Sequence, residues 1–265
     1  MTNNSQTDIY DRQKRISGWN QSLIENSKVA VFGAGALGNE TTKLLLQIGV
    51  KKITIVDYDT VSEVNLNRCL FFTKEDAANS DLKARVIARN SKNINPDSVV
   101  QFIASKIEDL PERSFFNHFD AVFGCLDNLA ARLHANAHCY KKVPYIDGGT
   151  FGFNGKVQVV DDSSSCIECA FSNRDYALLW KKYSCVGQAL DFIEPAMPAL
   201  PSTTSIVASV AVNEFIKLIH KKQSIAKKFS FPETDLVGKY WYFNGLTNQS
   251  STYSISKRKN CPVHL

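Results

Sequence analysis

Two widely separated pairs of residues have the types and the spacing of a metal site. Cys166 and Cys169 form a Cys-x-x-Cys pair, and Cys261 and His264 form a Cys-x-x-His pair. Such pairs suit tetrahedral zinc, and four protein ligands leave no open position, so we expect a structural zinc that fixes the C-terminal segment to the region after residue 160. Unrelated thiols beside a loose histidine are one alternative. A redox Cys-x-x-Cys is another, weaker because Cys166 does not open a helix directly after a strand.

A second group of residues has the pattern of a phosphate-binding turn. Gly33, Gly35 and Gly38 form a Gly-x-Gly-x-x-Gly motif between an apolar run at 29–32 and a segment of helical spacing. Glycines let the backbone turn sharply and approach a phosphate, and the start of the helix offers free N–H groups. Asp57 ends a second apolar run 19 positions after Gly38, close to the spacing of a carboxylate that holds ribose hydroxyls. The motif predicts an adenosine nucleotide but does not specify the chemistry.

Further charged residues belong to the same predicted edge of the sheet. Asp127 and Asn128 follow an apolar run at 120–125 and open a helical pattern, where the aspartate could be a helix cap or could hold Mg²⁺ beside a phosphate. Arg68 and Lys83 lie on segments that leave the same edge, although each alone is more typical of a surface charge. A nicotinamide oxidoreductase does not require this set. A reaction on ATP phosphates does, because charge builds on the departing pyrophosphate.

Cys185 is a candidate nucleophile in a loop of about 30 residues, 171–201, and a loop of that length is either functional or mobile. Lysines precede this cysteine, which favours an activated thiol. A partly buried thiol without a chemical role fits the same residues equally well.

The elements that must position these residues alternate between strand and helix up to about residue 150. This alternation predicts an α/β fold with a Rossmann-like, mostly parallel sheet and helices on both faces. Beyond it, we expect a C-terminal antiparallel part that carries the zinc. Its expected elements are a strand at 155–160, a helix at about 203–220 and a strand pair at 240–243 and 251–255.

Composition limits the possible classes of protein. A chain of 265 residues can bury one large core, or at most two, and the odd count of seven cysteines argues against a disulfide framework. A net charge of +5 fits an acidic protein partner or a polyphosphate but is too small to indicate nucleic acid as a ligand. The first eight residues are polar, and the longest apolar run, 206–219, is interrupted by polar side chains. We therefore expect no membrane association and a cytoplasmic location.

The chain resembles the MoeB/ThiF/HesA superfamily, the adenylating fold of ubiquitin-activating enzymes and of their sulfur-carrier relatives. The resemblance covers nearly the whole chain. The matching pieces are Tyr10-Asp11-Arg12-Gln13, the glycine motif at 33–38, Val56-Asp57-Tyr58-Asp59-Thr60-Val61 running into Asn65-Leu66-Asn67-Arg68, Lys83, Cys125-Leu126-Asp127-Asn128 with Arg132, the Cys-x-x-Cys at Cys166, and Asn260-Cys261-Pro262-Val263.

The resemblance implies a role for each matching residue. The glycine motif, Asp57 and Asn128 would bind ATP, with Asp57 on the ribose. Asn65, Arg68 and Lys83 would contact the phosphates, and Asp127 would bind Mg²⁺ and be essential for adenylation.

The resemblance also implies a role for Arg12 and a division of the chain into two halves. From spacing alone Arg12 indicates a solvated helix face. In the family such an arginine reaches into the ATP site of the neighbouring subunit, which implies a homodimer. One adenylation domain would span 1–265, with a nucleotide-binding half at 1–150 and a partner-binding and zinc half at 151–265. The crossover loop would lie at about 171–201.

The implied reaction is attack by the C-terminal carboxylate of a ubiquitin-like or sulfur-carrier protein, ending in Gly-Gly, on the α-phosphate of ATP. The products are an acyl-adenylate and pyrophosphate. If Cys185 then attacks the adenylate, a thioester forms and a conjugating enzyme follows; otherwise a sulfur donor or another acceptor takes over. The family usually ends its metal motif in cysteine, where this chain has His264, a competent ligand.

Two alternatives within the same fold stay open. A tRNA-modifying dehydratase would need a marked basic face, which the net charge does not indicate. A non-catalytic partner subunit would be expected to lack Arg12, Arg68, Lys83 or Asp127, and all four are present.

Overall fold

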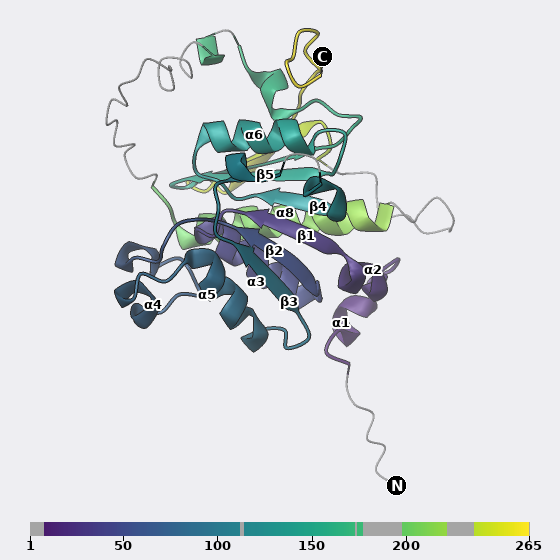
Figure 1. The fold of residues 1–265 in the computed structure, drawn as a ribbon. Helices are drawn as coiled ribbons and strands as arrows, with labels where there is room; N and C mark the ends of the chain where they lie inside the picture. Colours follow the sequence, from purple (N-terminus) through teal and green to yellow (C-terminus); the bar gives the residue numbers. More distant parts are fainter. Residues whose placement is uncertain (1–7, 112–113, 173, 177–197, 222–235, 265) are drawn as a thin grey trace, which may run out of the picture.

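The structure is a computed structural model that describes residues 8–111, 114–172, 174–176, 198–221 and 236–264. Eight strands form one sheet with helices on both faces (Figure 1). The strands are β1 (Lys28–Phe32), β2 (Lys52–Val56), β3 (Val99–Ile103), β4 (Ala121–Gly124), β5 (Tyr145–Phe151), β6 (Asn154–Val160), β7 (Lys239–Asn244) and β8 (Gln249–Ser254).

The α-helices are α1 (Asp11–Lys14), α2 (Gln21–Asn26), α3 (Ala36–Ile48), α4 (Lys74–Ala78), α5 (Lys83–Asn90), α6 (Leu129–Cys139) and α8 (Pro201–Lys221). Short 3₁₀ turns are η1 (Glu63–Asn65), η2 (Ser91–Asn93), η3 (Ile107–Asp109), η4 (Phe116–His118) and η5 (Ile167–Ala170).

The strand order is β3-β2-β1-β4-β5-β6-β7-β8. All pairs from β3 to β5 are parallel, and the pairs β5–β6, β6–β7 and β7–β8 are antiparallel. This arrangement confirms the predicted fold class. The chain runs outward from β1 to β3 and then returns to place β4 on the other side of β1. The strand order therefore reverses between β1 and β4, and such a switch point opens a crevice at the carboxyl ends of the strands.

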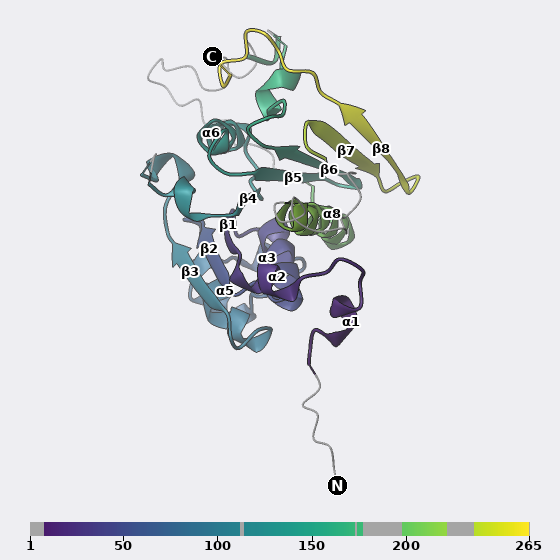
Figure 2. The same ribbon diagram turned by 90° about the vertical axis from the view of Figure 1, so that its right-hand side faces the viewer.

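The helices form two layers that bury two separate apolar clusters. α3, α5 and α8 pack on one face of the sheet around residues such as Val29, Val31 and Phe215. α6 packs on the other face, where Phe32, Ala135 and Cys139 are buried together. Figure 2 shows α3 and α8 on one side of the sheet and α6 on the other. Strands buried on both faces read as continuous apolar runs, which is why 29–32 was recognisable as a central strand.

The observed elements differ from the expected ones mainly at their ends. β8 runs from Gln249 to Ser254, where the sequence indicates 251–255, because it pairs with β7 along its full length. α8 spans Pro201–Lys221, where the pattern predicts about 203–220.

α8 is a core helix that is also long and apolar enough to match a membrane-spanning helix. By length and composition alone it could cross a bilayer, contrary to the expectation from its interrupted apolar run. Just over half of its apolar stretch is buried inside the protein, and its residues Val207, Ala211 and Phe215 belong to the cluster beneath the sheet. This burial is the usual state of a core helix.

Candidate functional site

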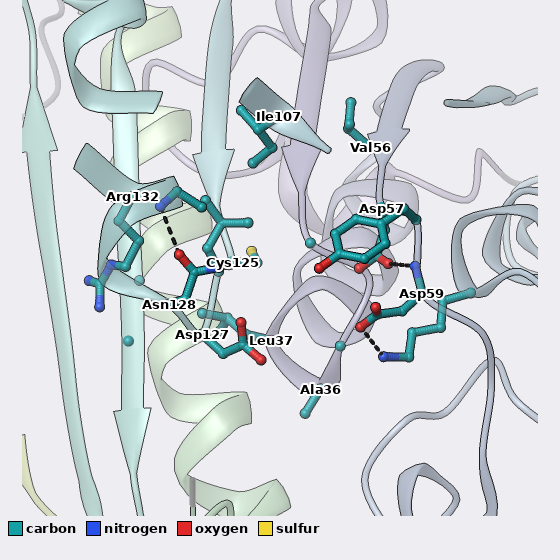
Figure 3. A pocket seen from close by; sticks show the side chains of 18 of the residues that line it. Ala36, Leu37, Val56, Asp57, Asp59, Ile107, Cys125, Asp127, Asn128 and Arg132 are labelled. Carbon is teal, nitrogen blue, oxygen red and sulfur yellow. Dashed lines mark hydrogen bonds and ion pairs between the residues drawn. The ribbon is translucent and has the colours of Figure 1, made fainter. Parts of the chain in front are cut away.

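A cavity of about 780 Å³ lies at the carboxyl ends of the central strands, at the switch point between β1 and β4 (Figure 3). Figure 3 shows Asp57 and Asp127 on opposite sides of it, with Ala36 and Leu37 of α3 between them. Eight of the residues singled out in the sequence line this cavity: Gly33, Gly35, Asp57, Asn65, Arg68, Lys83, Asp127 and Asn128.

The glycine turn is dictated by sterics. Gly33 has a φ of +94°, and a Cβ there would lie 2.4 Å from the carbonyl oxygen of Cys125. Gly38 does not line the cavity; a Cβ on it would lie 2.0 Å from the carbonyl oxygen of Gly33, so its role is close packing of α3 against the turn. Gly35 faces open space at the start of α3, where no side chain caps the helix. The first N–H groups of α3 therefore point to a site suited to an anion.

Asp57 holds this turn in place. One carboxylate oxygen accepts a hydrogen bond from the N–H of Ala34 at 2.6 Å, and the other accepts from the N–H of Asp59 at 2.7 Å. Burial raises the pKa of Asp57, while these two hydrogen bonds oppose the shift. The aspartate expected to contact a ribose is thus also the residue that fixes the glycine turn.

The predicted phosphate ligands already have partners within the protein. Lys83 donates to Asp59 at 2.8 Å, and its own side chain is mostly buried, whereas that of Asp59 is exposed. Arg68 is partly exposed and donates to the Val64 carbonyl and to Asn67. The side-chain oxygen of Asn65 accepts from the N–H of Ser62 at 3.0 Å and closes the turn η1.

Asp127 and Asn128 have different roles, because one caps a helix and the other leaves its carboxylate open. Asn128 is the N-cap of α6, since its side chain accepts from the N–H of Ala131 at 2.8 Å. Asp127 is exposed to the cavity and has no hydrogen bond within the part of the chain that the structure describes. The capping interpretation of Asp127 is therefore wrong, and its carboxylate is available to a cation.

Arg132 belongs to a buried ion pair that the sequence did not reveal. Its guanidinium donates to both oxygens of Asp147, one of them at 3.0 Å, and the side chains are 11% and 3% exposed. The hydroxyl of Tyr145 donates to the same carboxylate at 3.2 Å. Asp147 was missed because no motif marks it; its only signal is a carboxylate in the middle of an otherwise buried strand.

Arg12 lies far from the cavity of its own chain. Tyr10 and Gln13, on either side of it, pack at the C-terminal end of α3: a Cβ on Gly49 would lie 2.9 Å from the Tyr10 ring, and Gln13 donates to the Ile48 carbonyl at 2.8 Å. The glycine turn is at the opposite end of this 13-residue helix, about 20 Å away. Arg12 itself is exposed. The remaining candidate, Cys185, lies outside the described residues.

The four predicted metal ligands come together although 92 positions separate the two pairs. Their ligand atoms all lie within 4.8 Å of one another. The sulfur of Cys166 is 3.9 Å from that of Cys169 and 3.5 Å from that of Cys261, and the Cys169 sulfur is 3.7 Å from Nδ1 of His264. A tetrahedral zinc with sulfur ligands at about 2.3 Å would separate two sulfurs by about 3.8 Å. This cluster therefore fits a single metal ion.

Comparison with known proteins places these features in a family context. The model of the ThiF family matches residues 10–263. The chain is 36% identical over 149 residues to SUMO-activating enzyme subunit 2 of Dictyostelium discoideum. The matched region covers 55% of this chain and 22% of that protein. It is 30% identical over 166 residues to molybdopterin-synthase adenylyltransferase of Escherichia coli K12, which is 60% of this chain and 66% of that protein.

The fold is similar to that of Escherichia coli MccB solved with ATP, with a TM-score of 0.73 at 20% identity over 97% of this chain and 74% of that one. An identity this low shows a shared fold only. The match to the SUMO-activating subunit spans less than a quarter of that protein's length.

The buried ion pair gives a prediction for stability. We expect Asp147→Asn to lower the free energy of unfolding by about 3–5 kcal/mol, because Arg132 stays buried without its carboxylate. Asp11→Asn, which breaks an exposed pair with Arg15, should cost less than about 1 kcal/mol. Urea unfolding of Asp147→Asn, Arg132→Met and the double variant Arg132→Met/Asp147→Asn measures the coupling, with Asp11→Asn as the exposed control. A double variant as unstable as the sum of its single variants would contradict this account.

Proposed function

Because the chain belongs to the ThiF family, we propose that it uses ATP to adenylate the C-terminal carboxylate of a ubiquitin-like or sulfur-carrier protein. The observation that carries this proposal is the single cavity in which the glycine turn, Asp57, Lys83 and the open carboxylate of Asp127 meet. The relatives' names point the same way, since they are a SUMO-activating subunit and a molybdopterin-synthase adenylyltransferase.

The cavity offers a complementary surface for each part of ATP. The uncapped N-terminus of α3 and the glycine turn suit the phosphates. Asp57, on the next strand, can accept hydrogen bonds from ribose hydroxyls. Val56, Ile107 and Leu126 line the same cavity and give an apolar wall for the adenine ring.

The reaction needs positioning and neutralisation of charge rather than a protein nucleophile. An oxygen of the carrier's terminal carboxylate attacks the α-phosphorus of ATP, and the bond from that phosphorus to the bridging oxygen of pyrophosphate breaks. Negative charge builds on the departing pyrophosphate, where Lys83 and Arg68 would lie. Lys83 can change partner from Asp59 to a phosphate because Asp59 is exposed and becomes solvated when released.

Asp127 would hold Mg²⁺, which supplies positive charge at the phosphates when it is bound. Its carboxylate is open to the cavity because Asn128 caps α6 in its place. The proposal also includes a homodimer and a downstream step. That step is either a thioester on Cys185 followed by a conjugating enzyme, or the action of a sulfur donor or another acceptor on the adenylate.

The first test measures ATP–pyrophosphate exchange in the presence of small proteins that end in Gly-Gly and are encoded beside this gene. We expect exchange with one of them. Asp127→Ala should lower the rate about 100-fold or more, because the open carboxylate is the one placed to hold the metal. Glu75→Ala, which removes an exposed carboxylate from α4, should leave the rate unchanged. Exchange by Asp127→Ala at the wild-type rate would remove this residue from the mechanism.

The position of Arg12 generates a second test. If Arg12 completes the cavity of a second copy, Arg12→Ala and Asp127→Ala should each be inactive alone. Mixed after unfolding and refolding together, they should recover roughly a quarter of wild-type exchange, because half of the dimers then contain one complete site. Without any recovery on mixing, the proposal that Arg12 acts on a second subunit would fail.

The Cys/His cluster generates a third test. We propose that Cys166, Cys169, Cys261 and His264 hold a structural zinc, so protein purified without chelators should contain about one zinc per chain. Cys261→Ser should lower the zinc content to near zero and the melting temperature by about 5–10 °C, because metal-binding energy contributes to folding. Cys69→Ser, which changes a buried thiol outside the cluster, should keep its zinc. A zinc content near zero in the wild type would defeat the assignment.

A further inference from the structure

A partly buried lysine, Lys156, lies beside the cavity without an assigned role. Lys156 on β6 lies opposite Gly149 on β5, and both side-chain positions face α6, as Asp147 does. A Cβ on Gly149 would lie 2.9 Å from Cε of Lys156 and 3.2 Å from a terminal nitrogen of Arg132. Gly149 and Arg132 line the cavity. The glycine thus leaves room for two cations to approach each other at the cavity wall.

The positive charge at this wall exceeds the negative charge. Both oxygens of Asp147 accept hydrogen bonds from Arg132, and one also accepts from the Tyr145 hydroxyl. Lys156 has no hydrogen bond or ion pair with the residues that the structure describes. The side-chain amide nitrogen of Gln158, two positions along the same strand, is also buried without a partner among those residues. Lys156 is therefore a cation without a protein partner among the described residues, beside a second donor that is also unpartnered.

Burial lowers the pKa of Lys156, and the positive charge of Arg132 lowers it further, while Asp147 opposes the shift. The titratable and charged groups that face Lys156 are Arg132 from α6, Asp147 from β5 and Tyr242 from β7. The charged form of Lys156 is therefore less favourable here than it is in water. A bound anion would remove that penalty and raise the pKa again.

The glycine turn, where the nucleotide phosphates would bind, lies on the other side of the cavity from Lys156. β6 is three strands from β1 in the sheet, which places Lys156 about 14 Å from the glycine turn. Lys83 and Arg68 lie on the opposite side of β1, near β2. On the side of Lys156, the face shared with Tyr242 and Tyr240 continues through β7 to β8, where Tyr253 is exposed. Figure 2 shows β7 and β8 extending past α6. A peptide can therefore approach Lys156 from the antiparallel edge.

We propose that Lys156, beside Arg132, binds the terminal carboxylate of the carrier protein before it attacks ATP. This inference rests on the proposed function and names a residue that selects the second substrate. A carboxylate and a triphosphate repel each other when they meet in one cavity. A cation on the side of the carboxylate offsets this repulsion and orients one oxygen toward the α-phosphorus. Arg132 keeps its pairing with Asp147, so Lys156 supplies the free charge.

Kinetics of the adenylation test this role. Lys156→Gln should raise KM for the carrier about 10-fold or more while KM for ATP stays within about twofold, because only the carboxylate loses its charged partner. Lys156→Arg should retain part of the carrier affinity. Lys52→Gln, which removes an exposed lysine at the start of β2, is the matched control and should behave as wild type. An equal rise in KM for ATP, or no change in KM for the carrier, would overturn the proposal.

A binding measurement separates this inference from the proposed function. The pKa of Lys156 can be followed by NMR of its side-chain nitrogen, assigned with Lys156→Gln, in the presence of a non-hydrolysable ATP analogue. We expect glycylglycine to raise it and glycylglycinamide, which lacks the carboxylate, to leave it unchanged. An equal response to both, no response to either, or the same rise with inorganic phosphate alone would overturn the inference. A response to glycylglycine alone, without ATP–pyrophosphate exchange for any carrier, would support the carboxylate site and reject the proposed function.

Discussion

The hydrogen bond from the Ala34 N–H to the carboxylate of Asp57 is the constraint on which the site depends. It ties the turn after β1 to the end of β2, and the N–H of Gly33 donates to the Val56 carbonyl at 2.9 Å beside it. This arrangement aims the uncapped start of α3 into the cavity. A side chain at Gly33 would collide with the carbonyl of Cys125, in the segment that leads from β4 to Asp127. The same turn therefore sets the distance between the carboxylate of Asp57 and that of Asp127.

Charge is distributed unevenly around this turn. On the side of β2, Lys83 is neutralised by Asp59, which is exposed and can release it. On the side of β5 and β6, Arg132 is held by a buried carboxylate, and Lys156 remains as the excess cation. The two sides suit two different anions, a polyphosphate near β2 and a carboxylate near β6. An enzyme that joins a carboxylate to the α-phosphate of ATP needs such a division, because both anions must enter one cavity.

The sequence was most informative where one short segment carries both an element and its chemistry. The glycine motif predicted the strand, turn and helix around it, and the Cys-x-x-Cys and Cys-x-x-His pairs predicted a cluster that the fold brings together. The mostly parallel sheet and its antiparallel continuation were also predicted correctly. Contacts between distant segments were not predictable. Arg132 pairs with Asp147, and Lys156 lies opposite Gly149 on the neighbouring strand. Both contacts depend on strand register, which spacing along the chain does not determine. Arg12 is a further case, because only the packing of α1 at the far end of α3 shows that it cannot reach its own cavity.

The central claim is that a carrier's carboxylate attacks the α-phosphorus of ATP in this cavity. It is tested most directly with a carrier whose terminal carboxylate is enriched in oxygen-18. Hydroxylamine attacks the acyl carbon of the adenylate and releases AMP with the oxygen that formed the new bond. The account predicts that this AMP carries one oxygen-18 atom. Oxygen-18 in inorganic phosphate with formation of ADP, or AMP free of the label, would contradict it.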